Sequence, residues 1–300
     1  MRYFTGCLRN PYLLLAAAAL FWSGNWIAGR ALAELVPPVA LTFWRWAIAL
    51  ALIAPLVAPR LWAQRALLAQ AWKPIVALGL LGGGLHNVLQ YWGLQYTSAT
   101  NGSILNSLTP IFIIVLGAAL LRDPFPRIAA VGATVSLAGA LAIITRLDFE
   151  VFRTFQLNRG DLLIIASLVM LAGYTLALRW RPQGLDALSF LACFALVAEV
   201  PVGIAYAAEY ASGARMVLNL TSVIGLLYVA VFPALLAYYF WNLGVAAIGA
   251  ARAGVFMHLM PFLGAAMGFA FLGERFGVHH AVGMALIIAG VTIASRKWAG

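Results

Sequence analysis

Charged side chains are scarce in this sequence. Aspartate, glutamate, lysine and arginine together make up 9% of its 300 residues, whereas about 25% is typical of a water-soluble domain. A soluble all-helical protein would need charge on its outward helix faces, so the shortage excludes that class. It also argues against an intramembrane enzyme, because the sequence offers no paired carboxylates, no metal cluster and no nucleophile beside a base.

Cysteine is nearly absent as well. The two cysteines, Cys7 and Cys193, are far apart and have no metal-ligand spacing, which excludes a disulfide framework and a zinc site. We therefore expect neither a metal nor a cofactor. A cleavable signal peptide is not expected, because the first apolar run is long enough to be a true membrane span.

Hydrophobic residues are abundant: they make up 64% of the chain, and the mean hydropathy is +0.95. About 20 apolar residues are needed to cross the hydrocarbon core of a bilayer. Ten runs of roughly this length lie near residues 12–32, 38–58, 74–96, 99–121, 126–145, 161–179, 186–208, 219–242, 246–272 and 277–295. They predict an all-α polytopic membrane protein with ten transmembrane helices and no soluble domain. A transmembrane β-barrel would show short alternating strands instead.

The positive charges are distributed unevenly between the two sides of the predicted bundle. With the N-terminus inside, twelve lysines and arginines fall on the inner side and six on the outer side, while Arg45 lies within a span. This bias follows the positive-inside rule, so both termini are expected in the cytoplasm. The net charge of +10 therefore reflects topology in a lipid bilayer, and no nucleic-acid partner is expected.

The second half of the sequence repeats the first at a shift of 151 residues. Prolines and glycines stay in register over a long stretch, including the pairs Gly93/Gly244, Pro110/Pro261, Gly132/Gly283 and Gly139/Gly290. We expect a first five-helix repeat over residues 1–146, an outer linker over 147–160 and a second five-helix repeat over 161–300, all within one membrane domain. The matched Pro110 and Pro261 predict a paired helix bend in the fourth and ninth spans.

Each copy of the repeat holds an odd number of spans. The second copy must therefore enter the membrane from the opposite side, which produces the inverted repeat found in many secondary transporters. Such a pair has two near-equivalent states, one open to each side, with a binding site near the midplane. A duplication with a purely structural role is the alternative.

Polar and aromatic residues collect in the middle of several spans. Spacings of three and four residues place them on one helix face, and such groups usually face a bundle interior or a water-filled cavity. The residues predicted to bind a small-molecule substrate are Trp22, Asn25, Trp26, His86, Asn87, Gln90, Tyr91, Asn101, Asn106, Tyr174, Tyr238, Trp241, Asn242 and His258. A packing role is the alternative for the two histidines, and contact between helices is the alternative for the two asparagines of the fourth span.

Two charges lie inside spans. Arg45 is expected in the outer part of the second span, and Glu199 in the outer half of the seventh, which is the corresponding span of the second copy. Their similar depth allows a salt bridge or a water-linked pair that differs between the two states, and makes both residues candidates for coupling or gating. The alternative is that each reaches the outer interface or a partner of its own.

The end of each repeat carries a further pattern. Residues 261–291 contain a proline, a leucine-glycine-glutamate triplet, a phenylalanine and spaced glycines, and the first half repeats this with Pro110, Asp123, Gly132 and Gly139. Together with the opening residues Phe21–Ala28, the pattern resembles EamA-type members of the drug/metabolite transporter superfamily over essentially the whole chain. The aromatic-rich first, third and eighth spans are similar to bacterial aromatic amino acid exporters of the YddG type.

This resemblance implies ten spans in two inverted repeats around a central cavity, in a bacterial plasma (inner) membrane. It implies export of amino acids, with aromatic ones favoured because the ring-rich lining can stack on them, or of similar small metabolites. A multidrug or cationic exporter of the same superfamily is the main alternative, and a passive channel is a further one. The sequence leaves the oligomeric state open, and a monomer is compatible with it.

Overall fold

The computed structural model describes residues 10–97, 102, 105–122, 127–148, 150–153, 157–272 and 277–295. Within these ranges every regular element is a helix. Those before the sequence midpoint are α2 (Pro11–Leu32), α3 (Pro38–Ala63), α4 (Arg65–Gln70), α5 (Trp72–Leu78), η1 (Gly79–Leu85), α6 (His86–Gly93), α8 (Thr109–Leu121) and α9 (Arg127–Thr145). Those that follow are α10 (Glu150–Arg153), α11 (Arg159–Ala177), η2 (Leu178–Trp180), α12 (Ala187–Ala211), α13 (Leu220–Val229), η3 (Ala230–Leu236), α14 (Ala237–Ile248), α15 (Ala250–Val255), η4 (Phe256–His258), α16 (Leu259–Leu272) and α17 (Val278–Ser295).

Several of these helices are long and apolar enough to cross a membrane. In the described part of the chain there are six: Pro11–Leu32, Pro38–Ala63, Arg127–Thr145, Arg159–Trp180, Ala187–Ala211 and Leu220–Ile248. Two shorter apolar helices accompany them, Thr109–Leu121 and Val278–Ala294. Large apolar side chains such as Leu120 and Ile204, each 71% exposed, suit a lipid environment better than water. These features agree with the prediction of an all-helical polytopic membrane protein.

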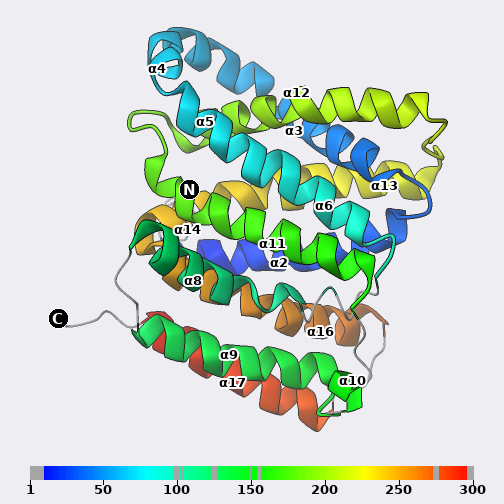
Figure 1. Cartoon of the computed structure of the whole chain (residues 1–300), viewed down its shortest axis with the longest axis vertical. Helices are drawn as coiled ribbons and strands as arrows, with labels where there is room; N and C mark the ends of the chain where they lie inside the picture. Colours follow the sequence, from blue (N-terminus) through cyan, green and yellow to red (C-terminus); the bar gives the residue numbers. More distant parts are fainter. Residues whose placement is uncertain are drawn as a thin grey trace.

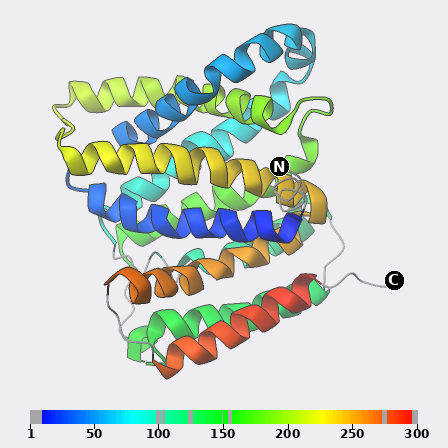
Figure 2. The same ribbon diagram turned by 180° about the vertical axis from the view of Figure 1, so that it is seen from behind.

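The helices lie side by side in one bundle (Figure 1). α9 and α17 form a closely packed pair along one side of it, as both Figure 1 and Figure 2 show. α4 and α10 lie at opposite ends of the bundle (Figure 1). Between α4 and α10 the chain crosses the bundle through α5–α6, then α8, then α9. Because the number of crossings is odd, α10 lies on the opposite side of the bundle from α4.

Helix starts follow the capping residues of the sequence. Asn10 Oδ1 accepts a hydrogen bond from the backbone N–H of Tyr12 ahead of α2. Asn158 forms a capping box with Asp161 at the start of α11, and Asn219 forms one at the start of α13. Each cap supplies an acceptor to first-turn N–H groups that have no partner within the helix. The caps therefore determine boundaries that hydropathy alone leaves open.

The break between α14 and α15 lies at Gly249, whose φ is +84°. Residues with a Cβ rarely adopt this backbone conformation, whereas glycine adopts it readily. α14 consequently continues to Ile248, beyond residue 242, where the run predicted from hydropathy ends.

Two π-helical segments interrupt long helices at matched places. η1 covers Gly79–Leu85 and η3 covers Ala230–Leu236, so both ends of the two segments differ by the repeat shift of 151 residues. The backbone N–H of His86 bonds Leu81 O, five residues back, and an equivalent bond closes η3. A π-turn leaves carbonyls without their α-helical donors, and such turns are frequent at functional sites.

The α9–α17 pair is built on glycines in reciprocal contact. A Cβ on Gly132 would lie 2.6 Å from Gly290 O, and a Cβ on Gly139 would lie 2.6 Å from Gly283 O. Gly283 and Gly290 are the repeat counterparts of Gly132 and Gly139, so each glycine contacts the counterpart of the other. Reciprocal contacts of this kind arise between units related by a twofold axis.

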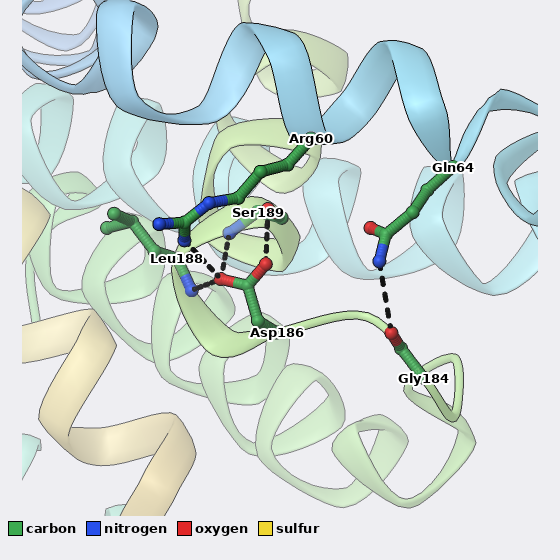
Figure 3. Close-up of polar contacts among 6 residues, drawn as sticks. All are labelled: Arg60, Gln64, Gly184, Asp186, Leu188 and Ser189. Carbon is green, nitrogen blue, oxygen red and sulfur yellow. Dashed lines mark hydrogen bonds and ion pairs between the residues drawn. The ribbon is translucent and has the colours of Figure 1, made fainter.

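A polar cluster joins the end of α3 to the start of α12 (Figure 3). Asp186 caps α12, because its Oδ1 accepts hydrogen bonds from the backbone N–H groups of Leu188 and Ser189, and its Oδ2 accepts one from Ser189 Oγ. Arg60 Nη1 lies 3.7 Å from Asp186 Oδ1. Burial raises the pKa of Asp186, but the hydrogen bonds from Ser189 and Leu188 and the charge of Arg60 outweigh it, so the pKa lies below its ordinary value.

Candidate functional site

A small cavity lies where residues from both halves of the chain meet. Its volume is about 20 Å³, which is room for about one water molecule. We call the residues that line this cavity the central site: Trp22, Asn25, Trp26, Arg45, His86, Asn87, Gln90, Asn106, Leu171, Tyr238, Met257 and Met260. Arg45, Asn87 and Tyr238 are each 1% exposed, so these polar groups have almost no contact with the medium around the protein.

The π-helical segment η1 supplies hydrogen-bond acceptors to the central site. Asn87 Nδ2 donates to Gly82 O at 2.8 Å and to Gly83 O at 2.9 Å. Tyr238 OH donates to Gly82 O at 2.7 Å, and Trp46 Nε1 donates to Gly83 O at 2.9 Å. Side chains thus donate hydrogen bonds to the carbonyls at the π-turn. Backbone groups at membrane depth need such partners within the protein, because lipid supplies none.

Arg45 brings a buried positive charge to the central site. Its Nη1 donates to Asn87 Oδ1 at 2.6 Å and to Tyr91 OH at 2.7 Å. Tyr91 OH in turn donates to Asn25 Oδ1 at 2.8 Å. The guanidinium is therefore held by two side chains of α6, one of which is bonded to α2 through Asn25. Among the described residues its buried Nε has no hydrogen-bond partner.

Arg45 and Glu199 do not form the salt bridge that their similar depth allows. Neither residue takes part in the ion pairs found within the described ranges. The guanidinium is drawn to Asn87 and Tyr91 on α6 instead. Glu199 is partly exposed on α12, and its buried Oε1 has no hydrogen-bond partner in the part of the chain that the structure describes. Each residue thus has surroundings of its own, and a coupling role stays a prediction.

A tyrosine–asparagine hydrogen bond occurs in each half of the chain. Tyr91 donates to Asn25 between α6 and α2, and Tyr174 donates to Asn242 between α11 and α14. Tyr91 and Asn242 are counterparts at the shift of 151 residues. The tyrosine of one half thus corresponds to an asparagine in the other, and both take part in a tyrosine–asparagine hydrogen bond.

Aromatic rings close the central site on the side of α14. Trp22 packs against Tyr238 and Trp241, with ring centroids 5.4 and 5.2 Å apart. Its Nε1 donates to Pro233 O in η3 at 3.0 Å. Tyr238 also packs against Tyr174 at 5.8 Å. Tilted and edge-on ring contacts are favourable, so these rings form one connected wall.

The two predicted histidines have different surroundings. His86 lines the cavity, and its Nδ1 donates to Ser167 O at 2.9 Å. His258 uses both ring nitrogens, because Nδ1 lies 2.6 Å from Ser136 Oγ and Nε2 donates to Ser107 O at 2.7 Å. His258 is fully buried and does not line the cavity, so the alternative of a packing histidine describes its place in this structure.

Most of the predicted substrate-binding residues lie in or next to the central site. Eight line the cavity: Trp22, Asn25, Trp26, His86, Asn87, Gln90, Asn106 and Tyr238. Four more are buried around these: Tyr91, Tyr174, Trp241 and Asn242. Asn101 lies outside the described residues. Three lining residues were not predicted, because apolar side chains inside a span carry no distinguishing signal: Leu171, Met257 and Met260.

The two matched prolines lie at helix starts. Pro110 is in the first turn of α8, and Pro261 is in the first turn of α16, directly after the 3₁₀ turn η4. A proline is tolerated in a first turn because its missing N–H would have no partner there. The ninth span is therefore interrupted ahead of its proline.

One protein family matches the chain twice. The EamA-like transporter family matches residues 9–145 and again residues 158–296, which correspond to the two copies of the sequence repeat. A solved crystal structure has a TM-score of 0.75 at 20% identity and covers 95% of this chain and 96% of its own. That likeness shows a shared fold.

Several curated relatives are transporters by name. "Uncharacterized transporter YyaM" of Bacillus subtilis is 25% identical over 95% of this chain and 93% of its own length. "Uncharacterized transporter YetK" of the same organism is 27% identical, with 96% and 88% covered. The "Probable terminal-alkyne amino-acid exporter" of Streptantibioticus cattleyicolor is 27% identical, with 76% and 74% covered. Because both halves match the family, as the sequence pattern predicted, this chain belongs to the EamA-like transporter family.

Proposed function

We propose that the protein is a secondary transporter that exports amino acids, with aromatic ones favoured, through the central site. The observation that carries the proposal is a buried cluster of indole, phenol, amide and imidazole groups where the two halves meet. Groups of this kind are costly at membrane depth and usually mark a substrate pathway. A relative named as an amino-acid exporter supports the substrate class.

The proposed architecture has ten spans in two inverted five-helix repeats, residues 1–146 and 161–300, joined by an outer linker over 147–160. The matched π-helical segments and the reciprocal glycine contacts support it. Asn87 Nδ2 also lies 3.3 Å from the OH of Tyr238, its own counterpart at the shift of 151 residues. A residue contacts its own counterpart only beside a twofold axis, which supports an axis running through the central site.

The proposed orientation has both termini in the cytoplasm of a bacterial inner membrane. The excess of lysine and arginine on the side of the N-terminus supports it. α4 and α10, which lie at opposite ends of the bundle in Figure 1, would then be cytoplasmic and external, respectively.

Transport requires the central site to open. Its cavity of about 20 Å³ is far below the roughly 300 Å³ at which ligand pockets begin. An aromatic amino acid therefore binds only after the lining has moved apart. In an inverted repeat, the two halves can separate toward one side at a time, so alternating access accounts for a site that is closed here.

Uptake into proteoliposomes tests the substrate class. Initial rates are measured for labelled phenylalanine, tyrosine, tryptophan, leucine, glutamate and lysine, with protein-free liposomes as the control. We expect saturable uptake of the aromatic amino acids and mutual competition among them. Rates equal to the protein-free control for every amino acid would contradict the proposal, and saturable uptake of an aromatic organic cation instead would support the multidrug alternative.

A further inference from the structure

Arg45 carries a buried positive charge that has no negative partner among the described residues. Its side chain is 1% exposed, and no carboxylate in the described part of the chain lies within ion-pair distance of it. The guanidinium carbon lies 5.3 and 5.6 Å from the ring centroids of Trp46 and Tyr91, which are favourable contacts but leave the charge in place. A buried charge is normally paired, so we expect an anion to bind beside this one.

One edge of the guanidinium is available for that anion. Within the described ranges, both hydrogen bonds of Arg45 are donated by Nη1, to Asn87 and to Tyr91. The buried Nε has no partner, and Nη2 lies on the same edge of the planar group. The N–H groups of that edge point in parallel, which is the geometry that binds both oxygens of a carboxylate. Arg45 lines the cavity, so a ligand that binds there after the lining has moved apart lies beside the guanidinium.

We propose that Arg45 binds the carboxylate of the transported amino acid through Nε and Nη2. The inference rests on the proposed function and extends it, since it names the chemical group that the site recognises. Asn87 and Tyr91 act as positioning residues that hold the guanidinium through Nη1. The indole rings of Trp22 and Trp26, which line the same cavity, are then left to contact the side chain of the substrate.

A chloride ion and the carboxylate of Glu199 in a second conformation are the competing occupants of this edge. Either would neutralise the charge without contacting the substrate. A measurement distinguishes them from a substrate carboxylate. If chloride or Glu199 occupies the edge, the affinity of the protein for a ligand does not depend on whether that ligand carries a carboxylate.

Ligands that differ from phenylalanine in one group test the inference on the intact wild-type protein. Dissociation constants of phenylalanine, phenylalaninamide and 3-phenylpropanoate are measured in detergent solution by titration calorimetry. We expect the amide, which has no carboxylate, to bind about tenfold to a hundredfold more weakly than phenylalanine, because one charged hydrogen-bonded pair is lost. 3-Phenylpropanoate keeps the carboxylate and is expected to bind more tightly than the amide.

Three variants locate the effect. Arg45→Gln should bind phenylalanine and its amide with nearly equal affinity, whereas Arg45→Lys keeps the charge without the parallel edge and should retain part of the preference. Arg30→Gln is the matched control, because Arg30 bonds Leu94 O and does not line the cavity, so the wild-type preference should persist. Size-exclusion elution and the unfolding midpoint establish that each variant is folded.

Equal affinity of the wild-type protein for phenylalanine and its amide would overturn this role of Arg45, even if phenylalanine is transported. If chloride stabilises the protein and phenylalanine does not displace the chloride, this edge of the guanidinium binds chloride. That result would also overturn the proposed role of Arg45. Failure of the wild-type protein to bind or transport any amino acid would instead contradict the proposed function.

Discussion

At the scale of single residues, the charged side chains of Asp186 and Arg45 have different surroundings. Asp186 is partly exposed at the start of α12, where backbone and side-chain groups and Arg60 bond its carboxylate. Arg45 is buried, and within the described ranges its hydrogen-bond partners are the neutral Asn87 and Tyr91. The first arrangement stabilises a helix start, while the second leaves a charge to be satisfied by a ligand.

Replacing Asp186 with alanine removes the cap of α12, and we expect it to lower the free energy of unfolding by about 1 kcal/mol. The pKa of Asp186 is lowered in the folded protein. Its contribution is therefore complete above the unfolded pKa of about 4 and is lost as the pH falls through the folded pKa. Unfolding midpoints of wild type and variant in detergent should differ at neutral pH and converge at the lowest pH that the fold tolerates.

Asp186→Asn is the control for that prediction, because it keeps an N-cap acceptor and removes the charge. We expect a smaller loss than for alanine at neutral pH. A difference between wild type and Asp186→Ala that stays constant with pH would contradict the assignment of charge to this cap.

Glu199 is the residue to test for proton coupling. Its buried Oε1 has no hydrogen-bond partner among the described residues, so a proton or an ion can bind there. If Glu199 carries the coupling proton, Glu199→Gln should abolish the dependence of uptake on a pH gradient. Glu209→Gln is the matched control, since Glu209 caps α3 by accepting from the backbone N–H groups of Val39 and Ala40 and should keep that dependence. Unchanged pH dependence in Glu199→Gln would remove it from the mechanism.

Arg45 also illustrates how far a sequence predicts a site. Residue type and spacing correctly indicated that polar groups such as Asn87 and Gln90 face inward. Periodicity does not specify how each helix is rotated and shifted against its neighbours. Glu199, the partner considered for Arg45, therefore does not lie beside it. The guanidinium lies instead among cavity residues that the sequence indicated as substrate-binding residues and not as partners of Arg45.

At the scale of elements, spans and their interruptions differ in how well the sequence predicts them. The run expected over residues 126–145 corresponds to α9, Arg127–Thr145, because every crossing needs about 20 apolar residues. The π-helical segments η1 and η3 carry no such signal. They depend on carbonyl partners such as Tyr238 and Trp46, which come from other helices, so local sequence cannot reveal them.

The close approach of α9 and α17 predicts that Gly139→Ala is destabilising. A Cβ there would lie 2.6 Å from Gly283 O and 2.8 Å from Ile287 N, so the helices must separate, at a cost of about 1–3 kcal/mol. The measurement is the unfolding midpoint in detergent. Gly173→Ala is the control, because its Cβ would make only an ordinary 3.8 Å contact with Leu81. Equal midpoints for the two variants would contradict the tight packing of this pair.

At the scale of the whole molecule, the two halves share a frame and differ in their lining. The glycines of the α9–α17 contact are the same residue type in both copies, as are Pro110 and Pro261. At the central site the counterparts differ, and Asn87 meets Tyr238. In the proposed mechanism, a symmetric frame supplies two near-equivalent states, while an asymmetric lining suits a small molecule with different ends.

Counterflow is the measurement that tests this account most directly. Proteoliposomes are preloaded with unlabelled phenylalanine and diluted into a trace of labelled phenylalanine, and the internal label is followed over time. Alternating access predicts that the label transiently accumulates above its equilibrium level, because each outward step with unlabelled substrate returns a site to the labelled side. A monotonic rise to equilibrium, as a channel would produce, would contradict the account.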